Sequence, residues 1–255
     1  MKFLAMIQAR CGSSRLPGKV LMDLCGKSVL QRMIERVQRS KYVDEVMVVT
    51  SIESENLPLI KLCTELGVRV GVGSENDVLD RYYQTAKLIK PQFIIRLTAD
   101  CPCIDPELID EAIDQMNDVD YMGMISQTFA DGLDIQIISY DALEKSWKEA
   151  IHSFEREHVT QYVIRHPEIF KIQDFKSKDG YFGDYRWTVD EPEDYEVVHQ
   201  IFKFFIEEKG TDIFGYKDIL CFMDEHPEVK KINSMFKRDE GLEKSIREDQ
   251  IISPR

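Results

Sequence analysis

The chain has 255 residues, of which 43% are hydrophobic, and its formal net charge is −13. A chain of this length and composition can bury one substantial hydrophobic core. The negative charge argues against a general affinity for nucleic acids or anionic membranes, because the surface as a whole repels phosphate. A phosphate-binding site must therefore rest on a local cluster of basic residues.

The N-terminal residues and the cysteines bear on where the protein is located. The apolar start, residues 1–7, is too short for a signal peptide, and no apolar run is long enough to cross a membrane. The six cysteines form no CxxC pair, which favours free thiols in a reducing compartment. We expect a soluble cytoplasmic protein that binds neither nucleic acid nor membrane.

Strand-like and helix-like segments alternate through the first hundred residues. Buried-type apolar runs predict strands at residues 3–7, 46–49, 68–72 and 93–97. Amphipathic periodicity predicts helices at residues 28–37, 59–66 and 77–89. Such alternation is typical of a mostly parallel sheet with helices on both faces. In this α/β architecture, ligands bind beyond the carboxyl ends of the strands.

The pattern is less regular after about residue 125. Residues 134–138 and 185–189 read as strands, and residues 139–165 look largely helical. A further helix begins near Pro192 and runs to about residue 207. No linker rich in Gly, Ser or Pro divides the chain, which favours one domain with an inserted subdomain. Residues from about 237 onward are charged and weakly periodic, which predicts a tail that is mobile or binds a partner.

Residues 8–19 directly follow the first predicted strand and concentrate positive charge in an otherwise acidic protein. The basic and small residues of this loop are Arg10, Gly12, Ser13, Ser14, Arg15, Gly18 and Lys19. Glycines let the main-chain N–H groups approach a ligand, and guanidinium and ammonium groups form strong charge-assisted bonds to phosphate. The pattern favours a loop that binds a nucleoside triphosphate over a surface turn with incidental basic residues.

The spacing in this loop excludes two common nucleotide motifs. Five residues separate Gly12 from Gly18, whereas the P-loop has four, and Val20 rather than Ser or Thr follows Lys19. The GxGxxG dinucleotide pattern is also absent here. A P-loop ATPase and an NAD enzyme are therefore poor fits.

Two aspartates follow predicted strands. Asp100 comes just after residues 93–97, and Asp190 ends the run 185–189. Magnesium usually takes one or two protein carboxylates and completes its shell with water and phosphate oxygens, so the pair fits a metal site. Each aspartate equally fits the N-cap of a following helix. Spacing alone leaves both interpretations open.

The segment Ile7–Leu21 resembles the N-terminal signature of the sugar-acid cytidylyltransferases, the group of the CMP-Kdo and CMP-acylneuraminate synthetases. It is most similar to the branch called spore coat polysaccharide biosynthesis protein F. Further stretches that resemble this branch occur in the same order and are Ser74–Tyr82, Arg96–Pro102, Asp131–Asp134, Arg156–Thr160 and Arg186–Asp194. The Kdo enzymes differ at Ser74–Tyr82, which leaves the base contacts open.

The resemblance implies a Rossmann-like three-layer α/β/α fold of the nucleotide-diphospho-sugar transferase (GT-A-like) type. It implies a Mg²⁺-dependent transfer of CMP from CTP to a sugar acid or sugar phosphate, by a homodimer. The expected organisation is a cytidylyltransferase domain over residues 1–236, with an inserted substrate or dimerisation region at about 125–185, and a charged tail over 237–255.

The resemblance also implies roles for individual residues. The catalytic cations are Arg10, Arg15 and Lys19, and the magnesium ligands are Asp100 and Asp190. The nucleotide-binding residues are Ala9, Arg10, Gly12, Ser13, Ser14, Arg15, Lys19, Asp77 and Arg81. The acceptor-binding residues are Asp131, Asp134 and Arg156. Asp131–Asp134 equally fits an Asp-Gly turn, Arg156 a solvated helix face, and His158 a structural histidine.

Rival functions remain at this stage. Asp118-Val-Asp120 is a DxD tripeptide of the kind that glycosyltransferases use to hold a metal, although such tripeptides arise often by chance in a chain with 46 acidic residues. The basic loop suits a leaving triphosphate better than a bound nucleotide sugar. Transfer of CMP to a non-sugar phosphorylated molecule and non-catalytic nucleotide binding are further alternatives.

Overall fold

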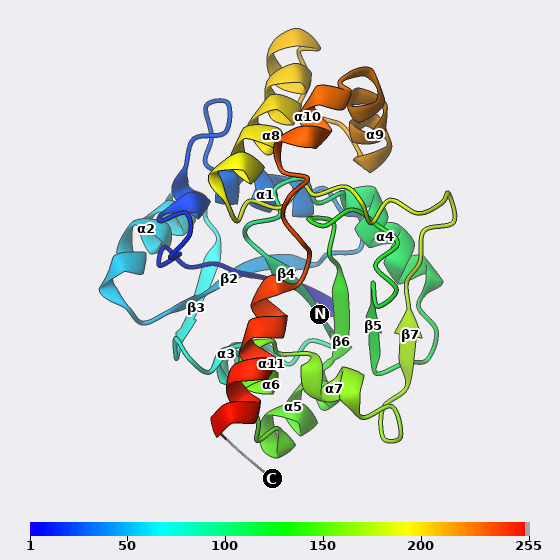
Figure 1. The fold of residues 1–255 in the computed structure, drawn as a ribbon. Helices are drawn as coiled ribbons and strands as arrows, with labels where there is room; N and C mark the ends of the chain where they lie inside the picture. Colours follow the sequence, from blue (N-terminus) through cyan, green and yellow to red (C-terminus); the bar gives the residue numbers. More distant parts are fainter. Residues whose placement is uncertain (253–255) are drawn as a thin grey trace.

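The computed structural model describes residues 1–252, which form a seven-stranded sheet covered by helices on both faces (Figure 1). The strand order is β3-β2-β1-β4-β6-β5-β7. The strands are β1 (Phe3–Gln8), β2 (Glu45–Ser51), β3 (Arg69–Gly73), β4 (Phe93–Thr98), β5 (Tyr121–Gly123), β6 (Gln136–Ser139) and β7 (Ile172–Asp174). Strands β1 to β4 are parallel, and β6 runs antiparallel to both β4 and β5.

One face of the sheet carries the larger part of the core. Alternate residues of β1 point to opposite faces, and Phe3, Ala5 and Ile7 point to this one. The helices that pack here are α1 (Val29–Val37), α2 (Leu57–Glu65), α4 (Pro106–Gln115), α8 (Pro192–Lys203), α9 (Tyr216–Glu225) and α10 (Pro227–Ile232). Their buried apolar stripes meet the strands, as the periodicity of the first hundred residues predicts.

The opposite face buries Leu4 and Met6 of β1. The helices on this side are α3 (Val78–Ile89), α5 (Tyr140–Glu149), α6 (Ser153–Glu157) and α7 (Gln161–Arg165). The chain after α10 then passes in front of β4 and β6 in Figure 1 and enters α11 (Glu240–Ile252), which packs along α6. The three-layer α/β/α fold expected from the sequence is confirmed.

The predicted elements of the first hundred residues are confirmed, and local chemistry explains their ends. Ser28 caps α1 by accepting a hydrogen bond from the N–H of Gln31 at 3.1 Å, and Asp77 caps α3 in the same manner. Gly67, with φ +68°, closes the turn after α2.

One prediction for the second half is wrong. Residues 185–189 form no strand, because their N–H groups bond to two loops rather than to a neighbouring strand. The Trp187 N–H donates to the Asp131 carbonyl at 2.6 Å, and the Val189 N–H to the Asp100 carbonyl at 2.7 Å. Residues 139–165 are largely helical, as predicted, and form the three short helices α5 to α7.

Within the described residues, the inserted region and the tail expected from the sequence both belong to the folded structure. Residues 125–185 supply β6 and β7 to the same sheet as the N-terminal strands. Residues 240–252 of the expected tail form α11, and its last three residues, 253–255, lie outside the described residues.

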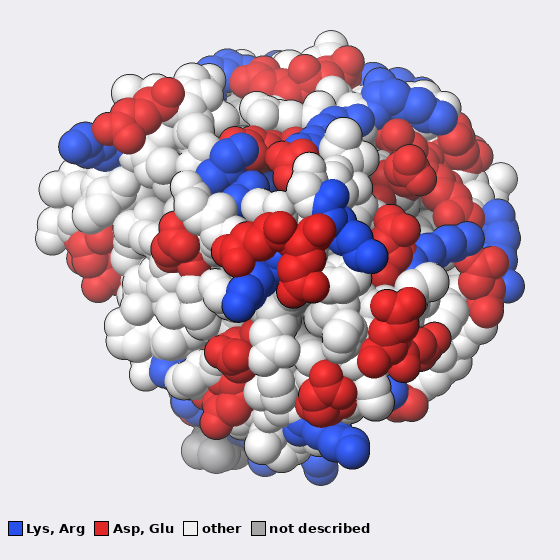
Figure 2. All heavy atoms as spheres, turned by 90° about the horizontal axis from the view of Figure 1, so that it is seen from above, with Lys and Arg blue, Asp and Glu red and all other residues white. Residues whose placement is uncertain are grey.

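The surface carries both signs of charge. Acidic and basic side chains alternate over the face seen from above, and neither sign forms a continuous field there (Figure 2). Within residues 1–252, no helix combines the length and hydrophobicity that a bilayer crossing requires.

Candidate active site

A cavity of about 410 Å³ opens at the carboxyl ends of β1 and β4, the edge at which ligands of parallel α/β sheets bind. Six segments that are distant in sequence line it. They come from residues 8–20, 96–101, 131–136, 158–161, 186–190 and 237–242. The fold thus brings the basic loop, both candidate metal ligands and the C-terminal segment to one place.

The loop after β1 is closed by its own backbone. The Gly18 N–H donates to the Cys11 carbonyl at 3.0 Å, and Gly18 adopts a left-handed conformation with φ +70°. The Cys11 N–H in turn donates to the buried Asn56 side chain at 2.8 Å. These bonds fix the loop so that Lys19, the residue after Gly18, begins a short 3-10 helix that faces the cavity.

Most, but not all, of the loop residues singled out in the sequence line the cavity. Ala9, Arg10, Ser13, Ser14 and Arg15 line it together with Lys19. Gly12 does not line it; a Cβ there would meet only the carboxylate end of the exposed Glu55 side chain, which can move aside.

The Lys19 ammonium lies between the two candidate metal ligands. Its Nζ is 3.0 Å from Asp100 Oδ2 and 2.7 Å from Asp190 Oδ1, and the side chain is only 10% exposed. Burial acts to raise the pKa of Asp100, but the Lys19 charge and the hydrogen bonds from Thr98, Lys19 and Cys101 together outweigh it and lower the pKa to about 2. Burial likewise acts to lower the pKa of Lys19, and the two carboxylates reverse the direction. Lys19 and Asp100 are therefore both charged at neutral pH.

The N-cap interpretation of these aspartates is wrong. Asp105 caps α4, and Glu191 is the N-cap residue of α8. Asp100 and Asp190 instead direct carboxylate oxygens at a common point in the cavity. Two converging hard oxygen donors fit a divalent cation such as Mg²⁺, and residues 1–252 contain no cluster of three or more His, Cys, Asp or Glu that offers another metal site.

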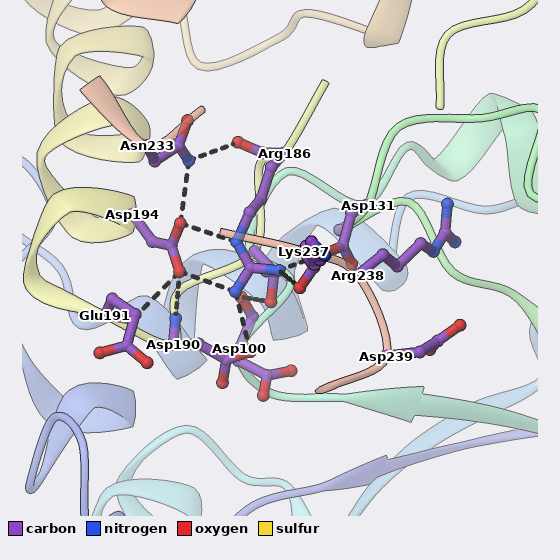
Figure 3. A network of polar contacts seen from close by, with 12 residues as sticks. Asp100, Asp131, Arg186, Asp190, Glu191, Asp194, Asn233, Lys237, Arg238 and Asp239 are labelled. Carbon is purple, nitrogen blue, oxygen red and sulfur yellow. Dashed lines mark hydrogen bonds and ion pairs between the residues drawn. The ribbon is translucent and has the colours of Figure 1, made fainter. Parts of the chain in front are cut away.

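Arg186 ties Asp190 to the protein interior (Figure 3). Its Nη2 is 3.2 Å from Asp190 Oδ2, and its Nη1 is 2.6 Å from Asp131 Oδ2. Its Nε and Nη2 make two bonds of 2.9 Å to Asp194, a carboxylate with 0% exposure. One guanidinium group therefore contacts three carboxylates from two different segments.

Asp194 completes this network from the first turn of α8. It accepts hydrogen bonds from the N–H groups of Asp190 at 3.1 Å and Glu191 at 3.0 Å, and from the Asn233 amide at 2.9 Å (Figure 3). The backbone on both sides of Asp190 is thus fixed by a buried acid. Asp190 is positioned by tertiary contacts and not by a strand.

A second cation, Arg238, comes from the C-terminal segment. Its guanidinium pairs with Asp134 and donates to the Phe129 carbonyl at 2.9 Å. Burial and the neighbouring Asp134 raise the pKa of Asp131, which Arg186 opposes. Gly132 between the two acids has φ +105°, and a Cβ there would collide with the Trp187 backbone, so only glycine fits this turn.

Several residues singled out in the sequence lie outside the cavity lining. Asp77 caps α3 and pairs with Arg156 at 2.7 Å, and Arg81 is 2% exposed beneath them. The Asp77–Arg156 pair joins the start of α3 to α6, and Arg81 donates to the Glu75 carbonyl at 3.3 Å. Their predicted contacts with nucleotide or acceptor stay predictions.

The DxD tripeptide lies at the wrong edge of the sheet for the cavity. Strand β5 is parallel to β4, so Asp118 and Asp120, which precede β5, lie at the amino edge. Asp118 is 98% exposed and pairs with Lys171 at 2.7 Å. This geometry removes the main observation in favour of a glycosyltransferase.

Sequence reasoning assigned no role to three cavity-lining arginines, Arg96, Arg186 and Arg238. For Arg96 a signal exists, since it interrupts the apolar run of β4. Arg186 lies within one of the quoted stretches, whereas Arg238 lies in the expected tail, where no pattern distinguishes it from its charged neighbours.

Known proteins are similar to this chain over most of its length. The family model described as cytidylyltransferase matches residues 4–219. The spore coat polysaccharide biosynthesis protein SpsF of Bacillus subtilis is 36% identical over 214 residues, which cover 78% of this chain and 86% of that protein. The 3-deoxy-manno-octulosonate cytidylyltransferase of Geobacter sulfurreducens is 36% identical over 115 residues, 44% of each chain.

A solved cytidylyltransferase from Leptospira borgpetersenii superposes with a TM-score of 0.84 at 33% identity, covering 90% of this chain and 96% of that one. The family match includes five of the six segments that line the cavity and ends before the sixth, residues 237–242. The chain belongs to the cytidylyltransferase family and is a CTP-dependent nucleotidyltransferase.

Proposed function

We propose that this protein transfers CMP from CTP to a sugar acid or sugar phosphate, with release of pyrophosphate, for the biosynthesis of a surface polysaccharide or glycan. The observation that carries the proposal is the position of the Lys19 ammonium, between Asp100 and Asp190 at the mouth of a basic loop. The similarity to SpsF and to the Kdo cytidylyltransferase supports the acceptor class.

The loop residues bind the triphosphate in this proposal. The Arg10 and Arg15 side chains are 49% and 42% exposed, so their guanidinium groups can leave Glu75 and Glu191 and turn toward a ligand. Together with Lys19, they offset the negative charge that develops on pyrophosphate as it leaves. The backbone at Ala9 and the hydroxyls of Ser13 and Ser14 add neutral donors along the same wall.

Asp100 and Asp190 hold a divalent metal ion, which we propose to be Mg²⁺. When bound, this ion neutralises phosphate charge and lowers the pKa of an acceptor hydroxyl. Lys19 then exchanges its contacts with the two carboxylates for contacts with phosphate oxygens. Arg186 and Asp194 keep Asp190 in place throughout, because their mutual bonds are buried and do not involve the ligand.

In the reaction, an acceptor oxygen forms a bond to the α-phosphorus while the bond from that phosphorus to the bridging oxygen of pyrophosphate breaks. The two oxygens must lie in line, so the protein contributes mainly position and charge. An acceptor phosphate needs no base, whereas an acceptor hydroxyl gives up a proton. Asp131 and Asp134 lie where sugar hydroxyls can bond to them.

The proposal also covers the location and the oligomeric state of the protein. All six cysteines lie within the described residues and are free thiols, which supports a cytoplasmic location. We also propose a homodimer, in which residues 125–185 take part in the acceptor site or the subunit contact. Light scattering on the purified protein measures the mass of the assembly directly.

Pyrophosphate release tests the proposed reaction. The purified protein is incubated with Mg²⁺ and each of the four ribonucleoside triphosphates, against a panel of sugar acids and sugar phosphates. Release that requires both CTP and one acceptor is the expected result. Transfer from a nucleotide sugar without CTP turnover would establish the glycosyltransferase alternative. CTP binding in calorimetry with no product from any acceptor would contradict the proposed transfer.

A further inference from the structure

Arg96 is a cation in the middle of the sheet, two residues before β4 ends. It lies directly opposite Met6 of β1 and Gln136 of β6, on the face that buries Ile94 and Ile138. The helices α3 and α5 to α7 cover the rest of this face, so the half-buried guanidinium faces the cavity at the edge of an apolar layer. An arginine here is costly to bury without a compensating anion.

No acidic residue contacts this guanidinium in the described part of the chain. Its Nη1 donates to Gln136 Oε1 at 2.8 Å, and its Nη2 to Gln8 Oε1 at 3.2 Å. Its Nε is buried and has no hydrogen-bond partner among residues 1–252. Gln136 Oε1 also accepts from the buried Thr160 hydroxyl at 3.1 Å, which fixes the amide. Neutral oxygens therefore orient Arg96 without neutralising it.

The carboxylates that line the cavity are engaged elsewhere. The pairs are Asp100 and Asp190 with Lys19, Asp131 with Arg186, and Asp134 with Arg238. Asp239 and Glu240 are exposed on the C-terminal segment and form no ion pair with Arg96. The cavity thus keeps one oriented, uncompensated positive charge at its sheet side.

The neighbouring His158 does not compensate the positive charge of Arg96. Burial first, and the Arg96 charge in addition, lower the pKa of His158 to about 4, although Glu157 opposes the shift. The imidazole is therefore neutral at physiological pH and adds neither a negative partner nor a second positive charge.

We propose that Arg96 is a specificity residue that receives an oxyanion of the acceptor, a carboxylate or a phosphate, on its planar guanidinium. A guanidinium matches such a group with two parallel hydrogen bonds, and Nη1 and Nη2 each carry a second N–H besides the one that bonds to a glutamine. The inference rests on the proposed CMP transfer, and it assigns an anionic acceptor to the sheet side of the cavity.

The location separates this site from the triphosphate loop. Strand β4 lies between β1, which leads into the loop, and β6, which carries Gln136. The shorter of the two guanidinium contacts is on the β6 side. The loop already supplies three cations for phosphate, so a fourth on the other side is available to a different anion.

Kinetics of Arg96→Gln and Arg96→Lys test the proposal, with Arg247→Gln as a charge-matched control on exposed α11, outside the cavity. Pyrophosphate release is measured with CTP and the probes Kdo, N-acetylneuraminate and glucose 1-phosphate. We expect R96Q to raise the acceptor KM by about ten- to a hundredfold, the worth of a charge-assisted bond. The KM for CTP stays within about twofold, and R96K recovers part of the loss. A rise in the CTP KM instead, or an unchanged acceptor KM, overturns the proposal.

A second measurement does not require turnover. In ¹⁵N-labelled protein, the Arg96 Nε–H resonance is identified by its absence from R96K and is followed while Kdo or inorganic phosphate is added. A saturable shift with Kdo assigns a carboxylate subsite, and one with phosphate assigns a phosphate subsite. No shift with either probe overturns the proposal. A shift without pyrophosphate release would retain the anion site while CMP transfer fails.

The thermal unfolding midpoint excludes a purely structural role. Because Arg96 has no carboxylate to lose, R96Q is expected to unfold at or above the temperature of the parent protein. A lower midpoint together with an unchanged acceptor KM would mean that Arg96 only supports the sheet.

Discussion

The loop side and the sheet side of the cavity hold their positive charges in different ways. On the loop side, Lys19 and Arg15 pair with carboxylates, so the free protein is locally close to neutral. On the sheet side, Arg96 is held by the amides of Gln8 and Gln136 and its charge is uncompensated. In the proposed mechanism, the first arrangement would release cations when a ligand and a metal ion bind. The second would offer a permanent positive charge to an anionic acceptor.

The largest expected effect is on the free energy of unfolding. It comes from removing Arg186, the cation that holds Asp190 in place. Arg186→Met leaves Asp131, Asp190 and Asp194 without their shared cation, and breaking a buried ion pair typically costs about 3 to 5 kcal/mol. We expect the free energy of unfolding, measured in urea by circular dichroism, to fall by that amount.

Arg15→Met is the matched control for this change. Arg15 also contacts Asp190, at 3.0 Å, but its side chain is 42% exposed, so its loss costs about 1 kcal/mol or less. Equal losses in the two variants would show that Arg186 has no special structural role.

The next effect separates the chemistry of the loop side from its stability. Lys19→Ala is expected to reduce the turnover number at least about a hundredfold, because it removes a contact to the transition state. Lys27→Ala, which removes a cation paired with Glu35 outside the cavity, leaves turnover unchanged. Pyrophosphate release at the parent rate by K19A would remove the loop from the proposed mechanism.

The smallest effect probes the sheet side by pH. His158 is partly buried and its pKa is lowered to about 4, so the unfolded chain, with the ordinary value near 6.5, binds more protons between these limits. Stability is therefore fully present above pH 6.5 and falls by at most about 3 kcal/mol as the pH drops to 4.

Urea unfolding between pH 4 and pH 6.5 tests whether the free energy of unfolding falls as the pH is lowered. His158→Gln should flatten the decline. A steeper loss of stability in H158Q than in the parent would contradict the assignment of a neutral histidine.

Much of the fold could be predicted because its first half obeys local rules. Each strand of β1 to β4 is a short apolar run, and the capping residues Ser28 and Asp77 mark helix starts by their own hydrogen bonds. The loop after β1 could be interpreted for a similar reason, since its charges and glycines are contiguous. Electrostatics and backbone freedom within twelve residues needed no knowledge of distant partners.

The rest depends on contacts that no local pattern encodes. Residues 185–189 have the composition of a strand, yet their backbone bonds to the loops at Asp100 and Asp131 because β6 already pairs with β4 on that side. The roles of Arg96 and Arg238 depend on which carboxylates remain free after folding. Which carboxylates are free is determined by ion pairs between residues more than 50 positions apart, such as Arg186 with Asp131.

The C-terminal segment has a consequence for how such enzymes diversify. The family match ends at residue 219, yet residues 237–242 line the cavity, and Asp249 fastens α11 to His152 and the Ser153 N–H at 2.9 Å each. One wall of the cavity therefore comes from a segment beyond the family match. Replacement of this segment would be one way to change the acceptor while CTP use is kept, and we expect chimeras joined after residue 236 to show this.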